Sequence, residues 1–174
     1  MRHHGDMTDE AGRPEVVLMC GLAGSGKTTH AKELETRGYV RLSVDEEVWK
    51  RFGRFGVDYD ASLYEDHSAV ARRFLDERLT QLVSEGRDVV VDSSLWQRER
   101  RDEVKRLVER AGGRSRLVYL KTSEKVLRER LAKRAERFDA NAAFPITDEI
   151  FARFLGAFEE PSGEGEEVLC APDE

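Results

Sequence analysis

Short apolar runs alternate along the chain with longer segments that have helical periodicity. Runs of strand length stand at residues 16–20, 39–43, 89–92, 117–120 and 168–170. Segments with a helical pattern lie between them, at about 29–37, from 44 onward, and at 61–85, 97–111, 123–137 and 147–158. Strands that alternate with helices in this way predict an α/β fold of three layers with a five-stranded parallel sheet.

The run Val89–Val91 is apolar without interruption and is closed by Asp92. Such a run is typical of a central parallel strand that is buried on both faces. We expect Ser93 and Ser94 to cap the next helix. The basic run that begins at Arg98 is interleaved with acidic residues, which predicts a solvated helix face. Pro and Gly at 161–165 predict a flexible turn.

The two ends of the chain set the expected domain limits. Residues 1–14 are polar and contain glycine and proline, so we expect a disordered lead-in. Residues 15–174 are expected to form a single domain, because a chain of 174 residues fits one domain and shows neither an internal repeat nor a second domain. The N-terminus lacks the apolar stretch of a signal peptide, and no apolar run approaches the roughly 20 residues that span a bilayer. We therefore expect a cytoplasmic protein with no membrane partner; a monomer and a dimer both fit the sequence.

The charge of the chain is unevenly distributed. The formal net charge is −6, but the stretch from Glu159 onward holds seven acidic residues and no Lys or Arg, so the rest carries +1. A protein that binds duplex nucleic acid has a strongly basic surface, so a long nucleic-acid partner is disfavoured. The two cysteines, Cys20 and Cys170, lie in apolar strand-like segments. We expect both to be buried, in a reducing compartment, and to form neither a disulfide nor a metal pair.

Residues 21–28 carry the most specific chemical pattern in the chain, Gly-x-x-x-x-Gly-Lys-[Ser/Thr]. An apolar strand precedes this phosphate-binding loop (P-loop) and a helix follows it, which is the context that the pattern requires. Backbone N–H groups and the helix N-terminus would then face phosphate oxygens. Lys27 would reach the outer phosphates and the Thr28 hydroxyl would hold Mg²⁺. The expected nucleotide-binding residues are Gly21, Leu22, Ala23, Gly24, Ser25, Gly26, Lys27, Thr28 and Thr29.

Two acidic residues follow strands and are expected beside this loop, because ligands of such folds lie at the carboxyl ends of the strands. Asp92 could hold Mg²⁺ through water, orient an acceptor, or cap a helix. Asp45 could be a general base or part of a helix cap, since Ser43 and Glu46 have the spacing of a capping box.

Signatures of other nucleotide-binding classes are missing from the sequence. It contains no Asn-Lys-x-Asp base-reading motif of GTPases and no Leu-Ser-Gly-Gly signature of transport ATPases. The acid Asp92 is followed by serines, not by the Glu of mechanical ATPases. Of the classes of P-loop protein considered, a small phosphotransferase remains.

Residues 16 to about 160 resemble the P-loop kinases related to bacteriophage polynucleotide 5′-kinase, zeta-type toxins and chloramphenicol phosphotransferase, with small ATP-binding kinase-like proteins of the AAA type. The resemblance rests on the P-loop, Ser43-Val44-Asp45, the segment 89–94, and the basic helix that leads to Phe144-Pro145. It implies transfer of the γ-phosphoryl group of Mg·ATP to a hydroxyl, with Asp45 as the general base. Val48 stands where the polynucleotide kinase has an Arg, which weakens a polynucleotide specificity.

The same resemblance implies that residues of about 123–146 form a lid over the phosphates. Arg130 and Arg134 lie four residues apart, on one helix face, and are its expected catalytic arginines. The alternative is a solvated helix, because Glu124, Glu129 and other acids could pair with these bases.

The sequence therefore favours an ATP- and Mg²⁺-dependent phosphotransferase that acts on a hydroxyl of a small molecule. A 5′-hydroxyl polynucleotide kinase and an ATP-binding regulatory module without transfer activity are the alternatives. Aromatic residues near Asp45 are consistent with either an acceptor pocket or core packing. They are Trp49, Phe52, Phe55, Tyr59 and Tyr64.

Overall fold

Five parallel strands form a single sheet in the order β2-β3-β1-β4-β5 in the computed structural model. Their bounds are Glu15–Cys20 for β1, Val40–Ser43 for β2, Val89–Asp92 for β3, Arg114–Lys121 for β4 and Glu167–Cys170 for β5. β4 begins earlier than the apolar run predicts, because it pairs along the whole of β1. The predicted five-stranded parallel sheet is confirmed.

Helices connect these strands in the predicted alternation. They are α1 Lys27–Thr36, α2 Val44–Phe52, α3 Tyr64–Ser84, α4 Arg98–Arg110, α5 Glu124–Arg134 and α6 Asp148–Ala157, with the 3₁₀ turn η2 Ala61–Leu63 before α3. None of the helices within residues 12–142 and 144–171 has the length and apolar character needed to cross a membrane.

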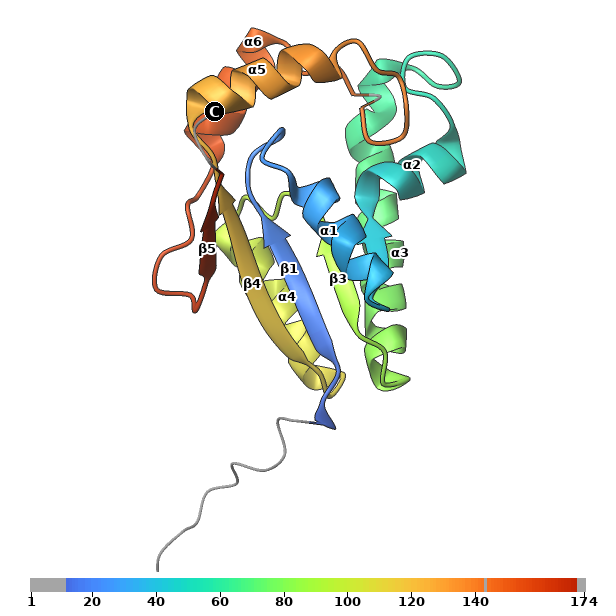
Figure 1. Cartoon of the computed structure of the whole chain (residues 1–174). Coiled ribbons are helices and arrows are strands. Elements are labelled where there is room, and N and C mark those ends of the chain that lie inside the picture. The colour runs from blue at the N-terminus through green and yellow to red at the C-terminus, as the bar shows by residue number, and fades with distance from the viewer. Residues whose placement is uncertain (1–11, 143, 172–174) are drawn as a thin grey trace, which may run out of the picture.

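The alternation of side chains along β1 divides the core into two layers around the sheet. Val16 and Leu18 pack with apolar residues of α3 and α4. Val17 and Met19 point to the other face and pack with Ala31 of α1 and its neighbours. All six residues of β1 are buried. Figure 1 shows α1 on one side of the sheet and α4 on the other. The predicted three-layer arrangement is therefore confirmed.

The structure describes residues 12–142 and 144–171. Most of the predicted lead-in, residues 1–11, lies outside this range. The end of that segment differs from the prediction, because the guanidinium of Arg13 donates hydrogen bonds to the carbonyl oxygens of Gly112 and Gly113, at 3.4 and 2.6 Å. The residues directly before β1 are thus tied to the turn before β4.

Helices α5 and α6 lie across the edge of the sheet at which the strands end (Figure 1). Their buried side chains Leu127, Leu131 and Phe151 form a separate apolar cluster. Leu22 and Ala23 of the P-loop pack against this cluster. The segment predicted to be a lid therefore touches the phosphate-binding loop through apolar contacts.

The connection from β3 to α4 differs from the prediction. Helix α4 follows Gln97 and has no side-chain cap, so Ser93 and Ser94 do not cap it, and Asp92 is not a cap either. Leu95, which lies between the two serines and the start of α4, has a φ of 43° and is buried. The chain turns sharply at this left-handed residue before the helix begins, which moves the helix start away from the serines.

Two expectations about exposure were wrong, and the turn before β5 is held more firmly than predicted. Cys20 is buried as predicted, but Cys170 is exposed, because β5 is an edge strand. Arg101 lies within the basic run predicted to be solvated, yet its side chain is fully buried. It donates two hydrogen bonds of 2.9 Å to the carboxylate of Glu164. The side chain of Glu164 is only 2% exposed, so the predicted flexible turn at 161–165 is anchored to α4.

Candidate active site

The loop between β1 and α1 is shaped around its glycines. A Cβ on Gly21 would lie 2.6 Å from the Oγ of Ser25, which is too close for any other residue. Gly26 precedes α1 with φ 96°, a left-handed conformation that glycine adopts without strain. The predicted nucleotide-binding residues 21–29 therefore form a continuous turn from the end of β1 into the first turn of α1.

Several polar groups of this loop suit a triphosphate. The Oγ of Ser25 is buried and has no hydrogen-bond partner within the described part of the chain. Gly26 brings no side chain to cap α1, and the first turn of α1 carries no acidic residue. The first N–H groups of a helix have no partner inside it, and its N-terminus attracts anions. An anion with several oxygens, such as a triphosphate, would satisfy these donors.

Lys27 is folded back into the loop. Its ammonium donates hydrogen bonds of 2.9 Å to the carbonyl oxygens of both Gly21 and Leu22. Burial lowers the pKa of Lys27 to about 8, although the nearby carboxylates of Asp92 and Asp45 oppose this shift. The lysine and both predicted acidic residues therefore share one electrostatic environment.

Asp45 lies in the first turn of α2, with its carboxylate directed at an aromatic side chain. The hydroxyl of Tyr64 donates a hydrogen bond of 3.1 Å to its Oδ1. Burial raises the pKa of Asp45, while the Tyr64 hydrogen bond and the charge of Arg134 oppose this. A carboxylate of raised basicity next to a cation is suited to accept a proton.

The N-terminus of α2 is capped by a neighbour of Asp45 and not by Asp45 itself. Ser43 caps α2, since its hydroxyl accepts from the backbone N–H of Glu46 at 3.3 Å. The Glu46 carboxylate does not complete a capping box, because it accepts from Arg41 at 2.7 Å and from the amide of Asn141 at 3.1 Å. Glu46 is thus held by Arg41 and Asn141, whereas Asp45 lines a pocket that does not include Glu46.

Asp92 is paired with an arginine that the sequence did not single out. Arg41 of β2 donates to Oδ2 of Asp92 from Nε at 3.0 Å and from Nη2 at 2.8 Å. Arg41 was given no role by the sequence analysis. Its position two residues before the end of a strand that carries Ser43 and leads to Asp45 was the available signal. Oδ1 of Asp92 accepts no hydrogen bond from a described residue, which leaves it available to a hydrated cation.

The bases of α5 and the loop after it separate into two groups. The guanidinium of Arg130 donates to the carbonyl oxygen of Gly24 in the P-loop, at 3.2 Å. Arg134 lines a pocket together with Asp45, and its buried Nε has no partner among the described residues. The other bases are exposed, as the solvated-helix alternative predicts: Lys125, Arg128, Lys133 and Arg137.

The pocket around Asp45 is walled by aromatic side chains from segments distant in sequence. Besides Asp45 and Arg134, its lining comprises Val48, Trp49, Gly53, Phe55, Tyr59, Tyr64, Ala140 and Phe144. Four of the five aromatic residues predicted near Asp45 thus line it, and Phe52 does not. Phe144 comes from the loop between α5 and α6.

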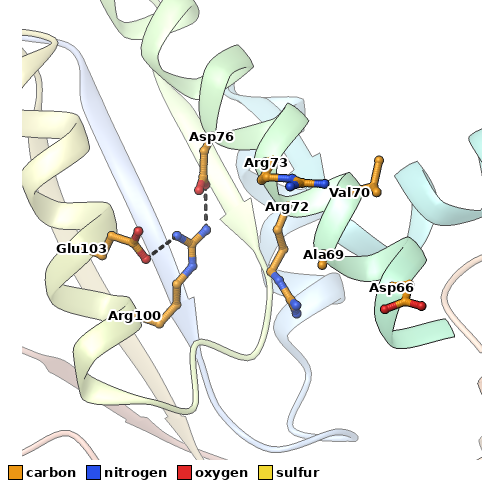
Figure 2. A pocket seen from close by; sticks show the side chains of 8 residues that line it. All are labelled: Asp66, Ala69, Val70, Arg72, Arg73, Asp76, Arg100 and Glu103. Carbon is orange, nitrogen blue, oxygen red and sulfur yellow. Dashed lines mark hydrogen bonds and ion pairs between the residues drawn. The ribbon is translucent and has the colours of Figure 1, made fainter. Parts of the chain in front are cut away.

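A larger surface hollow lies elsewhere, between α3 and α4 (Figure 2). Arg100 bridges its two sides, with hydrogen bonds of 2.7 Å to Asp76 and 2.8 Å to Glu103. Three arginines and three acids line this hollow, so its formal charges balance. None of the predicted site residues lies in this hollow. The larger of the two hollows is therefore not the candidate active site.

Comparisons with known proteins agree with this geometry. A family model described as an AAA domain matches residues 16–161. The UPF0200 protein PAE1629 of Pyrobaculum aerophilum is 32% identical over 124 residues, which are 71% of this chain and 68% of that protein.

Two solved structures share the fold. A gluconokinase from Sinorhizobium meliloti 1021 has a TM-score of 0.62 at 21% identity, and the match covers 92% of this chain and 85% of that one. The APS kinase CysC of Mycobacterium tuberculosis, solved with AMPPNP and APS, has a TM-score of 0.62 at 21% identity, and the match covers 93% and 91%. The matched family model spans the P-loop, both acidic residues and α5. The chain thus belongs to the AAA domain family.

Proposed function

We propose that this protein is an ATP- and Mg²⁺-dependent phosphotransferase that moves the γ-phosphoryl group of ATP to a hydroxyl of a small molecule. The observation that carries the proposal is the position of Asp45. Its carboxylate lies in a pocket lined also by Arg134, and it interacts electrostatically with Lys27 of the P-loop. A proton acceptor, a cation and a phosphate-binding loop together are what transfer to an alcohol needs.

The donor half of the reaction belongs to residues 21–29. Their backbone N–H groups would bind the phosphates, and Lys27 would leave the carbonyl oxygens of the loop to pair with the outer ones. The Thr28 hydroxyl and the free Oδ1 of Asp92 would hold Mg²⁺, Asp92 through water. This ion, when bound, supplies neutralisation of phosphate charge.

The acceptor half belongs to the pocket. The acceptor oxygen forms a bond to the γ-phosphorus, and the bond from that phosphorus to the β,γ-bridging oxygen of ATP breaks. The hydroxyl proton passes to the carboxylate of Asp45, and ADP leaves with the bridging electron pair. Arg130 and Arg134 would stabilise the negative charge of the transferring group, and α5 with the loop after it would act as the lid.

A coupled assay of ADP release tests this function. The wild-type protein with Mg·ATP is given alcohols, nucleosides, antibiotics and 5′-hydroxyl oligonucleotides in separate arms. We expect ADP release that depends on a small-molecule acceptor, its loss in Lys27→Ala, and a decrease on the order of 10²–10⁴-fold in Asp45→Asn.

Each arm of the assay has a distinct consequence. Transfer to the oligonucleotides alone would establish the polynucleotide alternative. Tight ATP binding without transfer to any acceptor would establish a regulatory module. Wild-type turnover in Asp45→Asn would remove Asp45 from the role of base, and Glu46→Gln serves as the matched control, because Glu46 does not line the pocket.

A further inference from the structure

The side chain of Asn141 joins the loop after α5 to β2 and α2. Its Oδ1 accepts a hydrogen bond of 3.2 Å from Nη2 of Arg41, and its Nδ2 donates one of 3.1 Å to Oε1 of Glu46. These partners lie 100 and 95 residues earlier in the chain. Figure 1 shows the loop between α5 and α6 descending towards α2. Both ends of the amide are therefore used to connect segments that are distant in sequence.

A tight turn presents Asn141 to these partners. The N–H of Ala142 donates to the carbonyl oxygen of Asp139 at 3.0 Å, and the N–H of Asn141 donates to Oδ1 of Asp139, also at 3.0 Å. An Asp at the first position of a β-turn commonly accepts such a bond. The other oxygen of this carboxylate accepts from Arg137 at 2.7 Å, and Ala142 is buried. The turn at 139–142 thus has hydrogen bonds of its own that fix the direction of Asn141.

The guanidinium that Asn141 contacts also orients Asp92. Nε and Nη2 of Arg41 donate to Oδ2 of Asp92 at 3.0 and 2.8 Å, so the same Nη2 serves both Asn141 and Asp92. Two donations to one oxygen restrict the rotation of the carboxylate, and they leave Oδ1 to the hydrated cation. The amide, the guanidinium and the carboxylate therefore form a continuous chain of polar contacts, in which each member orients the next.

The contact of Asn141 is polar and partly open to solvent. The side chain of Glu46 is 42% exposed, and Asn141 is only half-buried. A hydrogen bond that water can replace contributes little to the stability of a fold. Loss of the Asn141 side chain should therefore leave the fold intact, so that its effects can be measured at the site.

The same turn borders the candidate pocket. Ala140 precedes Asn141 and lines the pocket together with Asp45 and Arg134. Groups that hold a metal-binding side chain in direction increase the affinity for the metal, and their loss typically lowers it about 10–100-fold. Asn141 acts one contact further away, through Arg41, so a smaller effect is expected.

We infer that Asn141 is a positioning residue for the proposed phosphotransfer, on which this inference rests. It keeps the guanidinium of Arg41 in the orientation that presents Asp92 to the Mg²⁺ of Mg·ATP, and it holds the turn at 139–142 against this ion pair. Its action runs through Arg41. Asn141 should therefore affect the Mg²⁺-dependent part of nucleotide binding and leave the part that the P-loop supplies unchanged.

Calorimetric titration of the full chain with a non-hydrolysable analogue of ATP, once with Mg²⁺ and once with EDTA, tests this role without turnover. Asn141→Leu keeps the size of the side chain but removes both hydrogen bonds. We expect the affinity with Mg²⁺ to fall about 3- to 10-fold and the affinity in EDTA to stay within about twofold. In the background of Asp92→Ser, which removes the carboxylate, Asn141→Leu should have no further effect.

Gln81→Leu is the matched control, because the amide of Gln81 donates to the carboxylate of Glu85 at 2.9 Å at an exposed position of α3. It should leave both affinities unchanged, and denaturant unfolding establishes that each variant is folded. Equal losses of affinity with Mg²⁺ and in EDTA, or no loss, in Asn141→Leu would overturn the inference. A wild-type protein that binds Mg·ATP but transfers phosphate to no acceptor would overturn the proposed function, and these affinities would still decide the role of Asn141.

The sequence contains a single asparagine, which allows a direct spectroscopic measurement. Protein labelled with ¹⁵N at asparagine alone has one side-chain amide group in its NMR spectrum, that of Asn141. Addition of Mg²⁺ to the complex with the ATP analogue should shift this signal in the wild type but not in Asp92→Ser, because the carboxylate connects the ion to Arg41. A signal that does not respond in the wild type, or that responds equally in Asp92→Ser, would contradict the coupling.

Discussion

Arg41 and Asp92 form a buried ion pair at the carboxyl ends of β2 and β3. Both side chains are 4% exposed, and two N–H groups of Arg41 donate to the same oxygen of Asp92. The guanidinium also pairs with Glu46 and donates to the side chain of Asn141, at 3.2 Å. Arg41 thus joins the end of β3 to the first turn of α2 and the loop after α5, and the last two of these elements contribute residues to the pocket.

Loss of this arginine is expected to destabilise the protein strongly. Arg41→Met would leave the carboxylate of Asp92 buried without its cation, at a cost of about 3–5 kcal/mol in the free energy of unfolding. Denaturant unfolding measures this change. Asp102→Ala is the control, because the pair of Asp102 with Arg98 is exposed and should contribute about 0–1 kcal/mol. Similar stabilities of the two variants would mean that the Arg41 pair contributes little to folding.

The layers of the fold were predictable because they depend on local patterns. The uninterrupted apolar runs of β1 and β3 indicate burial on both faces of the sheet without any knowledge of the segments that pack against them. The role of Arg41 was not predictable in this way, because its burial depends on Asp92, which lies on a different strand. The same holds for Arg101, whose buried partner Glu164 is 63 residues away.

The candidate site was predictable to a similar extent. The P-loop and Asp45 could be located because a short motif and the end of a strand mark them. Phe144 was noted only within a matching segment, and its position beside Tyr64 arises from the fold of the loop after α5. The left-handed conformation of Leu95 had no signal at all, since residues other than glycine rarely adopt it.

ATP binding is expected to be linked to proton uptake by Lys27. The pKa of this lysine is lowered to about 8 in the protein without ligand, so it is half-neutral near that pH. Contact with phosphate favours the charged form, so binding should take up about half a proton per ATP at pH 8 and more as the pH rises further. Affinity for ATP should therefore fall as the pH increases above 8.

Calorimetry in buffers of different ionisation enthalpy measures this uptake. Lys27→Met should abolish it, whereas Lys32→Met, which removes an exposed lysine of the same helix, should retain it. Equal uptake in the wild-type protein and Lys27→Met would assign the proton to another group.

The hydrogen bond from Tyr64 should set the acid limb of the pH–rate profile. It stabilises the ionised form of Asp45 and so opposes the rise in pKa that burial causes. In Tyr64→Phe the pKa of Asp45 should rise, and the acid limb of kcat/KM should move to higher pH, because the base must be ionised to act. Tyr59→Phe keeps the hydrogen bond between Tyr64 and Asp45, so the acid limb of kcat/KM in this variant should stay at the wild-type pH. A limb that stays in place in Tyr64→Phe would show that Asp45 is not the titrating base.

The buried pair of Arg101 and Glu164 should hold the segment before β5 against α4. Glu164→Ala leaves the fully buried guanidinium without its partner, and we expect a loss of about 3–5 kcal/mol in the free energy of unfolding. Arg101 keeps the pKa of Glu164 below its ordinary value of 4.5, so the contribution is present above that pH and is lost as the pH falls through the lowered pKa. The difference between the wild type and Glu164→Ala should therefore shrink in acid. Glu167→Ala, which removes an exposed pair with Arg116, should show no comparable loss, and a wild-type stability of Glu164→Ala would contradict this account.

The bases of the proposed lid should differ sharply in their contribution to turnover. Arg134 is partly buried beside Asp45, where it can reach a transferring phosphoryl group, whereas the neighbouring Lys133 is exposed. Arg134→Ala should lower kcat on the order of 10³–10⁵-fold, as expected for an arginine that stabilises charge in the transition state, with little change in the affinity for ATP. Lys133→Ala should leave kcat within about twofold, since an exposed charge near the surface contributes little. Equal effects of the two substitutions on kcat would mean that α5 acts through its overall positive charge, and the specific placement of Arg134 next to Asp45 would then have no part in catalysis.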